Sequence, residues 1–472
     1  MDDPAHEPEF QAHASEHRPV DEVRASTAGT SINNLPTELL IIILDELQPI
    51  RSDLYNACLV DSRWCAIAQP LLFNVWCAHE RYWCDQNKYA LRYIRSLLDR
   101  PDLAASVNTI CMDSCEGHNP EMEPQDPPPL DLLRRMLEAA ERHRPGDEDW
   151  KTAISEGQHD AVLALMLYLL PRLHCLEFVM FYCEDPNLQC HWIANFAHQM
   201  SCQDSPATSP FLQNLRVIRA QNYTTECGFD MSVISPLLML PNVLEVETYA
   251  MDCLWLSSDG TWPAMSSKAR LLRLGHSGIE GRDFELLLGS FEALEVFEWQ
   301  WGDFYVTEAY PDVWEIGDTL RRQGNFLQRL VIDVAGSFWS EHEDENIGNI
   351  GSLAQLTLLK SITIPTVFVT GRDDDYLDDE FEPPLPFMNV FPAALEELNL
   401  VDMTVALPQY LLHMARCCAS KFPMLKVVRC PKWGPFDPEA DIETIRQIFE
   451  RAGVSLIEFR DVHLPHNFSC LL

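Results

Sequence analysis

Apolar residues at helical spacing begin shortly after residue 30 and predict a small helical module that ends near Trp76. In the first predicted helix, one set of apolar residues shares a face: Leu39, Ile42, Ile43 and Leu47. A second apolar set points in other directions: Leu40, Ile41 and Leu44. Because this helix is apolar nearly all round, we expect it to be covered on more than one side. Two further short helices are predicted over residues 52–60 and 62–69, the last ended by Pro70. Three such helices bury little surface by themselves, so the remaining apolar face docks either onto the downstream chain or onto a partner protein.

Downstream of the module, a motif of three apolar residues recurs. Two residues separate its first and second apolar positions, and one residue separates the second and third. Clear copies are Leu173-Leu176-Phe178, Leu327-Leu330-Ile332 and Leu395-Leu398-Leu400, and complete or partial copies run from residue 107 to residue 459. Helical segments precede most copies, so strand and helix alternate about every 30 residues. This alternation predicts an α/β fold, and it is typical of an irregular leucine-rich-repeat-like βα solenoid with a parallel sheet on its concave side. A doubly wound α/β domain is the alternative, although no glycine-rich fingerprint accompanies the strands.

Two sets of residues on the predicted strands are candidates for binding a target protein. The residue between the two core positions of each repeat faces the concave surface, and in five successive repeats its charge alternates: Glu177, Arg216, Glu245, Arg273 and Glu295. Strands about 4.8 Å apart would join these charges into a ladder, which is either a self-neutralised surface or a polar floor for a target.

The second set consists of aromatic residues at alternate positions after Val296, namely Phe297, Trp299 and Trp301. By alternation these three rings fall on the face opposite Leu294 and Val296, which is the face expected to be exposed. Exposed rings of this kind would form a binding hot spot. The alternative is a β-bulge that returns them to the core.

The N-terminal module resembles an F-box over about 45 residues. The resemblance rests on the order and spacing of these segments: Leu35-Pro36, Glu38-Leu39, Ile42-Ile43, Asp53-Leu54, Cys58-Leu59-Val60, Arg63-Trp64 and Pro70-Leu71-Leu72-Phe73. F-boxes similar to this one bind a Skp-type adaptor, which links them to a cullin and a ubiquitin-conjugating enzyme. By this resemblance, the adaptor-binding and core residues would be Leu35, Pro36, Leu39, Ile42, Ile43, Leu54, Leu59 and Trp64.

The resemblance extends beyond the module, because the irregular downstream repeats resemble the degenerate leucine-rich repeats of F-box proteins that are abundant in fungi. The domains predicted in this way are an acidic disordered tail (1–30), an F-box module (31–76), a helical linker (77–104) and the irregular solenoid (105–472), with an acidic, Pro-rich loop at 116–129. The resemblance implies a substrate receptor of an SCF-type ubiquitin ligase with an unknown protein target. A scaffold that does not promote degradation is the second hypothesis, and an unrecognised enzyme is the third.

The 472-residue chain has a formal net charge of −38. Such a surface repels phosphate backbones and anionic lipid, so we expect neither nucleic acid nor membrane among the partners. The acidic start has no apolar signal region, and the longest apolar run is ten residues, Ala161–Leu170. The expected compartment is therefore the cytoplasm or the nucleus, with the 16 cysteines reduced. Acidic runs at 341–345 and 373–382 are either solvated loops or sites for a basic partner.

The sequence indicates no catalytic chemistry. Phosphate-binding glycine loops, GxSxG and HExxH are absent. Cysteine and histidine crowd one region without the usual zinc spacing, at Cys183, Cys190, His191, His198 and Cys202. We therefore expect no catalytic residue, no cofactor and no metal, and we expect any ubiquitin transfer to take place on partner proteins.

Overall fold

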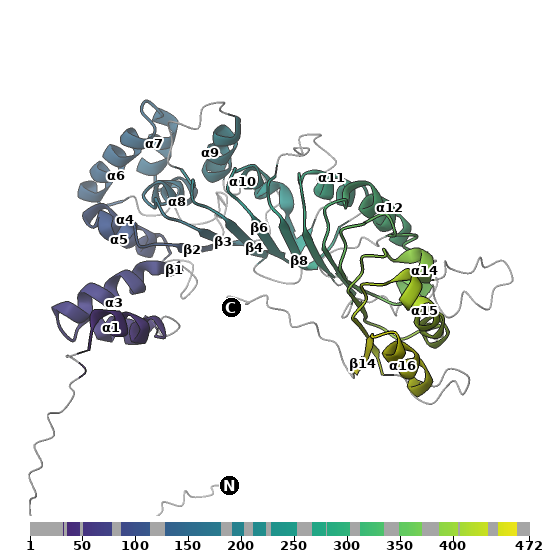
Figure 1. Ribbon diagram of the computed structural model, residues 1–472. Coiled ribbons are helices and arrows are strands. Elements are labelled where there is room, and N and C mark those ends of the chain that lie inside the picture. Colours follow the sequence, from purple (N-terminus) through teal and green to yellow (C-terminus); the bar gives the residue numbers. More distant parts are fainter. Residues whose placement is uncertain are drawn as a thin grey trace, which may run out of the picture.

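The computed structural model describes residues 32, 35–47, 51–77, 86–113, 128–180, 191–202, 211–222, 228–252, 267–279, 281–302, 312–334, 349–370, 387–404, 406–432 and 442–459. The protein is mixed α/β, with a helical start followed by strands and helices in alternation. In Figure 1 the strands form one curved sheet with helices along its outer side, and the helical start lies at one end of this arch. The predicted acidic tail, most of the loop at 116–129 and both acidic runs lie outside the described residues.

Three helices form the N-terminal module: α1 (Thr37–Asp45), α2 (Arg51–Cys58) and α3 (Ser62–Asn74). Asp61 caps α3, because its carboxylate accepts hydrogen bonds from the backbone N–H of Arg63 (2.8 Å) and Trp64 (2.9 Å). The prediction that Pro70 ends this helix is wrong, since α3 continues through it to Asn74. Packing of the leucines that follow Pro70 against the module compensates for the lost hydrogen bond. The module has its own core, made by Leu40, Leu44, Leu54, Ala57, Trp64 and Ala68.

The main sheet contains twelve strands, which pair in parallel in the order in which they occur along the chain. This order lacks the reversal that characterises a doubly wound sheet. The strands are β1 (Val75–Cys77), β2 (Thr109–Asp113), β3 (Cys175–Met180), β4 (Val217–Asn222), β6 (Glu245–Tyr249), β8 (Leu271–Ser277), β9 (Val296–Trp301), β10 (Arg329–Asp333), β11 (Ser361–Ile364), β12 (Glu397–Leu400), β13 (Val427–Pro431) and β14 (Ser455–Phe459). Two short strands, β5 (Phe229–Asp230) and β7 (Met251–Asp252), pair with each other.

The helices between the strands share one large apolar core with the side of the sheet that they cover. They are α4 (Gln86–Asp99), α5 (Pro101–Ala104), α6 (Leu130–His143), α7 (Glu148–Ser155), α8 (His159–Tyr168), α9 (His191–Cys202), the 3-10 helix η4 (Met231–Val233), α10 (Ser235–Leu238), α11 (Gly281–Gly289), α12 (Val313–Gln323), α13 (Val367–Thr370), α14 (Phe387–Val390), α15 (Leu407–Lys421) and α16 (Ile442–Arg451). Nearly every residue of α8 is buried, which explains the ten-residue apolar run in this part of the sequence.

The module joins the sheet without a linker, because α3 ends at Asn74 and β1 begins at the next residue. Tyr93 of α4 stacks on Phe73 and Trp76, with ring centroids 5.7 Å and 5.1 Å away. Arg51 of the module donates a hydrogen bond to the carbonyl oxygen of Val75 (2.9 Å). The sheet thus begins at Val75 rather than near residue 105, and α4 and α5, expected as a linker, contribute to its core. A strand of three residues is too short to show a period in the sequence.

Candidate functional site

Large apolar side chains are concentrated on the surface of the module. In the described part of the chain fifteen large apolar residues are exposed, and eight of them lie between residues 32 and 60. We call this set the exposed apolar surface of the module: Ile32, Leu39, Ile41, Ile42, Ile43, Tyr55, Leu59 and Val60. Ile42 and Leu59 are the most exposed, at 59% and 67%. Such a concentration of exposed apolar side chains is typical of an interaction site.

The position of this surface follows from the packing of α1. Leu40 and Leu44 lie one helical turn apart and are fully buried, with Leu47 partly buried beside the same core. The other apolar residues of α1 therefore point away from the core. The structure divides the helix differently from the two predicted sets, because Leu47 of the first set packs inward with Leu40 and Leu44, whereas Ile41 of the second set is exposed.

Two arginines hold the backbone around this surface. Arg63 of α3 donates a hydrogen bond to the carbonyl oxygen of Leu35 and another to the hydroxyl of Thr37 (3.4 Å). Arg51 ties the start of α2 to β1 through the Val75 carbonyl. The start of α1 is thereby fixed against α3, so the exposed side chains are presented on a rigid support.

The residues assigned by the F-box resemblance divide into two groups. Those on the surface are Pro36, Leu39, Ile42, Ile43 and Leu59. Leu35 is half-buried, and Leu54 and Trp64 lie in the module core. Sequence reasoning missed Ile41, Tyr55 and Val60 as surface residues. Leu54 and Ala57 form the buried face of α2. Their helical spacing in the sequence would have shown that Tyr55 lies outside this face.

Charged side chains alternate across the helix-free face of the sheet, as the sequence predicted, but in a different row. The register-paired row is Glu177, Arg219, Glu247, Arg273 and Glu298. Arg219 bridges Glu177 (2.7 Å) and Glu247 (2.9 Å), and Arg273 bridges Glu247 (2.6 Å) and Glu298 (2.7 Å). Although burial lowers the pKa of Arg219, its hydrogen bonds to the two glutamates raise that pKa above the ordinary value. This ion-pair row fits the self-neutralised alternative better than an open binding floor.

Three residues of the predicted ladder lie elsewhere. Arg216 precedes β4 and is exposed, and Glu245 opens β6 two residues before Glu247, the member of the row in that strand. Glu295 precedes β9, where it binds Arg270 (2.8 Å). The cause is the position of the motif relative to the strand. In β3 the motif coincides with the strand, but in β4 and β9 its middle residue, Leu215 or Leu294, lies in the turn before the strand.

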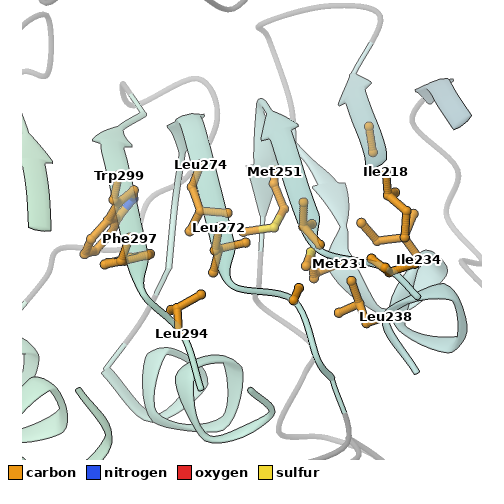
Figure 2. Close-up of a cluster of buried hydrophobic side chains, with 14 of the residues drawn as sticks. Ile218, Met231, Ile234, Leu238, Met251, Leu272, Leu274, Leu294, Phe297 and Trp299 are labelled. Carbon is orange, nitrogen blue, oxygen red and sulfur yellow. The ribbon is translucent and has the colours of Figure 1, made fainter. Parts of the chain in front are cut away.

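The prediction that Phe297, Trp299 and Trp301 are exposed is wrong. All three rings are buried, and Trp299 is only 1% exposed. Figure 2 shows Phe297 and Trp299 on the same side of the sheet as Leu272 and Leu274. The indole N–H of Trp299 donates to the carbonyl oxygen of Ser277 (3.0 Å), which satisfies its one polar atom. These residues belong to the core because β9 begins at Val296, which puts the odd-numbered residues on the helix side.

Two of the described thiols, those of Cys175 and Cys430, are buried within the sheet. Burial, with a smaller contribution from nearby Glu177, raises the pKa of Cys175 to about 12, and burial raises that of Cys430 to about 12. Both therefore stay protonated at neutral pH and are poor nucleophiles. Within the described ranges no group of three or more His, Cys, Asp or Glu could hold a metal ion. Of the predicted cluster, His191, His198 and Cys202 lie on α9, whereas Cys183 and Cys190 fall outside the described residues.

A scan of the described helices finds none with the length and apolar character needed to cross a membrane. No protein-family model matches the chain, and no curated protein matches it.

Proposed function

We propose that this protein is a substrate receptor of an SCF-type, cullin-based ubiquitin ligase. In this proposal the module binds a Skp-type adaptor, and the downstream sheet and helices, as an irregular leucine-rich-repeat-like solenoid, hold a protein target. One observation carries the proposal. The exposed apolar surface of the module includes four of the residues that the F-box resemblance assigns to adaptor binding, namely Leu39, Ile42, Ile43 and Leu59, and a fifth, Pro36, is also exposed.

Burial of this surface would provide the binding free energy. A large apolar side chain that becomes fully buried contributes about 1.5–3 kcal/mol. The loss of translational and rotational freedom on association consumes part of the total. A single exposed isoleucine would therefore not hold a partner, whereas the combined side chains of α1 and the end of α2 would.

The downstream architecture supports a receptor role. Parallel strands that follow one another in chain order, with helices along one side, are the arrangement of repeat proteins, which offer long surfaces to partners. A target held on this surface and an adaptor held on the module would be joined through one body. Binding would then act by proximity, raising the effective concentration of the target beside the conjugating enzyme.

Adaptor binding by variants of the module tests the first half of the proposal. We expect the double variant Ile42→Ser/Leu59→Ser to bind a purified Skp-type adaptor at least about tenfold more weakly than wild type in biolayer interferometry. Trp314→Ser is the matched control, because it removes a similarly exposed apolar side chain from α12. The adaptor proposal is wrong if wild type does not bind, or if the double variant binds as tightly as wild type.

A second experiment distinguishes a degradative receptor from a scaffold. Cells that express wild type are compared with cells that express Ile42→Ser/Leu59→Ser, with and without a proteasome inhibitor, by quantitative proteomics. A receptor predicts proteins that are depleted only by wild type and restored by the inhibitor. Reconstituted ubiquitylation of those proteins with the purified ligase then tests the transfer step directly.

A further inference from the structure

The turns that lead into the strands form a row along one edge of the sheet. The first residues of successive strands from β3 to β13 are register partners, so the residue three positions earlier occupies the same place in every turn. Before β3, β4, β6 and β8 this residue is polar, namely Arg172, Asn214, Asn242 and Lys268. Before β9 to β13 it is apolar, namely Ala293, Phe326, Leu358, Ala394 and Met424.

The polar and apolar halves of this row play different roles. Asn214 and Asn242 each donate a side-chain hydrogen bond of 2.7 Å to a carbonyl oxygen of the preceding turn, which joins neighbouring turns. Phe326, Leu358 and Met424 are instead 50%, 47% and 51% exposed, although the leucine that follows each of them is buried in the core. These three side chains thus contribute little to the fold.

We call Phe326, Leu358 and Met424, with Ala394 between the last two, the turn stripe. Neighbouring strands are about 4.8 Å apart, so the stripe is roughly 14 Å long from β10 to β13. This length matches about two to three turns of an α-helix. An amphipathic helix with apolar residues three or four positions apart would cover it.

The surroundings of the stripe are basic on a chain whose net charge is −38. In the turns before β10 to β14 and in the helix ends that lead into them, the exposed cations are Arg322, Lys360, Lys421, Lys426 and Arg451. The acids of the same segments are Glu396, which pairs with Lys426, and Glu450, and Arg322 pairs with Glu285 and Asp318 outside them. Lys360, Lys421 and Arg451 then leave this edge with an excess of positive charge. This edge therefore favours a negatively charged partner, in contrast to the molecule as a whole.

We propose that the turn stripe is a docking surface for an acidic, amphipathic peptide segment of a partner protein. The apolar side chains of the segment cover Phe326, Leu358 and Met424, and its carboxylates face Lys360 and Lys426. The site involves no residue of the module, so it stands independently of adaptor binding.

A peptide library panned on the full-length protein tests this docking surface. The probe is a phage-displayed random library of about 16 residues, long enough to cover the stripe as a helix. Peptides that also bind the Phe326→Ser/Met424→Ser variant are removed by counter-selection. We expect the peptides that depend on the stripe to be rich in Asp and Glu, with apolar residues three or four positions apart.

Synthetic copies of these peptides give the quantitative test. By fluorescence anisotropy they should bind Phe326→Ser/Met424→Ser and Lys360→Glu/Lys426→Glu about tenfold more weakly than wild type, and added salt should weaken binding to wild type. Lys268→Ser, in the polar half of the row, is the matched control and should bind like wild type. Thermal melts check that the variants fold, and Leu358→Ser replaces any variant that does not.

Three outcomes would overturn the proposal. Panning could yield no peptide that distinguishes wild type from Phe326→Ser/Met424→Ser. The selected peptides could be basic or uncharged, which would remove the role of the lysines. Light scattering could show a wild-type dimer that the stripe variant loses, in which case a second copy of this chain is the occupant.

Discussion

Single residues in this protein take opposite roles according to which face of the sheet they reach. In β9, Trp299 packs among helices, whereas its neighbour Glu298 reaches the helix-free face and accepts hydrogen bonds from Arg273 and Arg329. A displacement of one residue in the strand would exchange the two roles. The alternation of charge was predictable from sequence, because Arg219, Glu247 and Glu298 lie two or three residues after Arg216, Glu245 and Glu295 and carry the same charges. The members of the ion-pair row were not, because the motif does not show whether its middle residue lies in a turn, as Leu294 does, or in a strand, as Leu176 does.

Replacement of Trp299 by alanine distinguishes a core role from a binding role. The ring is stacked on Phe284 and packed against Trp301, with centroids 5.3 Å and 4.7 Å away, so its removal leaves a large cavity and takes away one of the two hydrogen bonds that the Ser277 carbonyl accepts. We expect Trp299→Ala to lower the free energy of unfolding by about 3–5 kcal/mol in urea titration. Gln300→Ala, on the helix-free face of the same strand, is the control and should lower it by only about 1 kcal/mol. Equal effects of the two substitutions would contradict the assignment of faces.

Among the elements, the helices of the module could be predicted closely from sequence. Pro36 and Asp61 directly precede α1 and α3, and the predicted starts of α2 and α3 lie within one or two residues of the observed ones, whereas Pro70 does not end α3. The inner face of α1 could not be predicted in the same way. Its helical period shows which residues share a face, but a helix that is apolar nearly all round does not show which face meets Leu54 and Trp64 of its neighbours.

The two faces of α1 should respond differently to substitution. Leu44 is fully buried, so Leu44→Ala should lower the free energy of unfolding by about 2–5 kcal/mol. Ile42 is exposed, so Ile42→Ala should change stability by less than about 0.5 kcal/mol and act only on partner binding. Chemical denaturation of both variants, followed by adaptor binding of the folded fraction, measures the two effects separately. A large loss of stability for Ile42→Ala would mean that the chain itself covers this side chain.

For the whole molecule, the sequence predicted an α/β fold with many parallel strands but not the place where the sheet begins. The three residues of β1 give no periodic signal, and their role is apparent only from pairing with β2 and from the Phe73–Tyr93–Trp76 stack. Stacked repeat sheets need protection at each end, since an unpaired edge strand invites aggregation. The direct passage from α3 into β1 makes the module the N-terminal end piece of the sheet as well as the candidate site.

Truncation of the chain on either side of this junction tests that structural role. A chain that lacks residues 1–77 loses the three register pairs of β1 with β2 and both rings that stack on Tyr93. Burial raises the pKa of the Tyr93 hydroxyl above its ordinary value, so removal of the cover should return this pKa toward about 10. We expect the truncated chain to lose roughly 3–5 kcal/mol of unfolding free energy, the contribution of about two large side chains, and to aggregate in size-exclusion chromatography.

A chain that lacks only residues 1–31 is the matched control, because it keeps α1 to α3 and β1 intact. It should elute like wild type in size-exclusion chromatography and unfold at the wild-type urea concentration. The two truncations together separate the contribution of the end piece from that of the preceding tail. If the chain without residues 1–77 were as stable and as soluble as the control, the module would be an independent unit, and the target would not be held in a fixed orientation relative to the adaptor. A cooperative loss of stability would instead mean that the exposed apolar surface of the module and the turn stripe belong to one rigid body, so that a partner on one is positioned relative to a partner on the other.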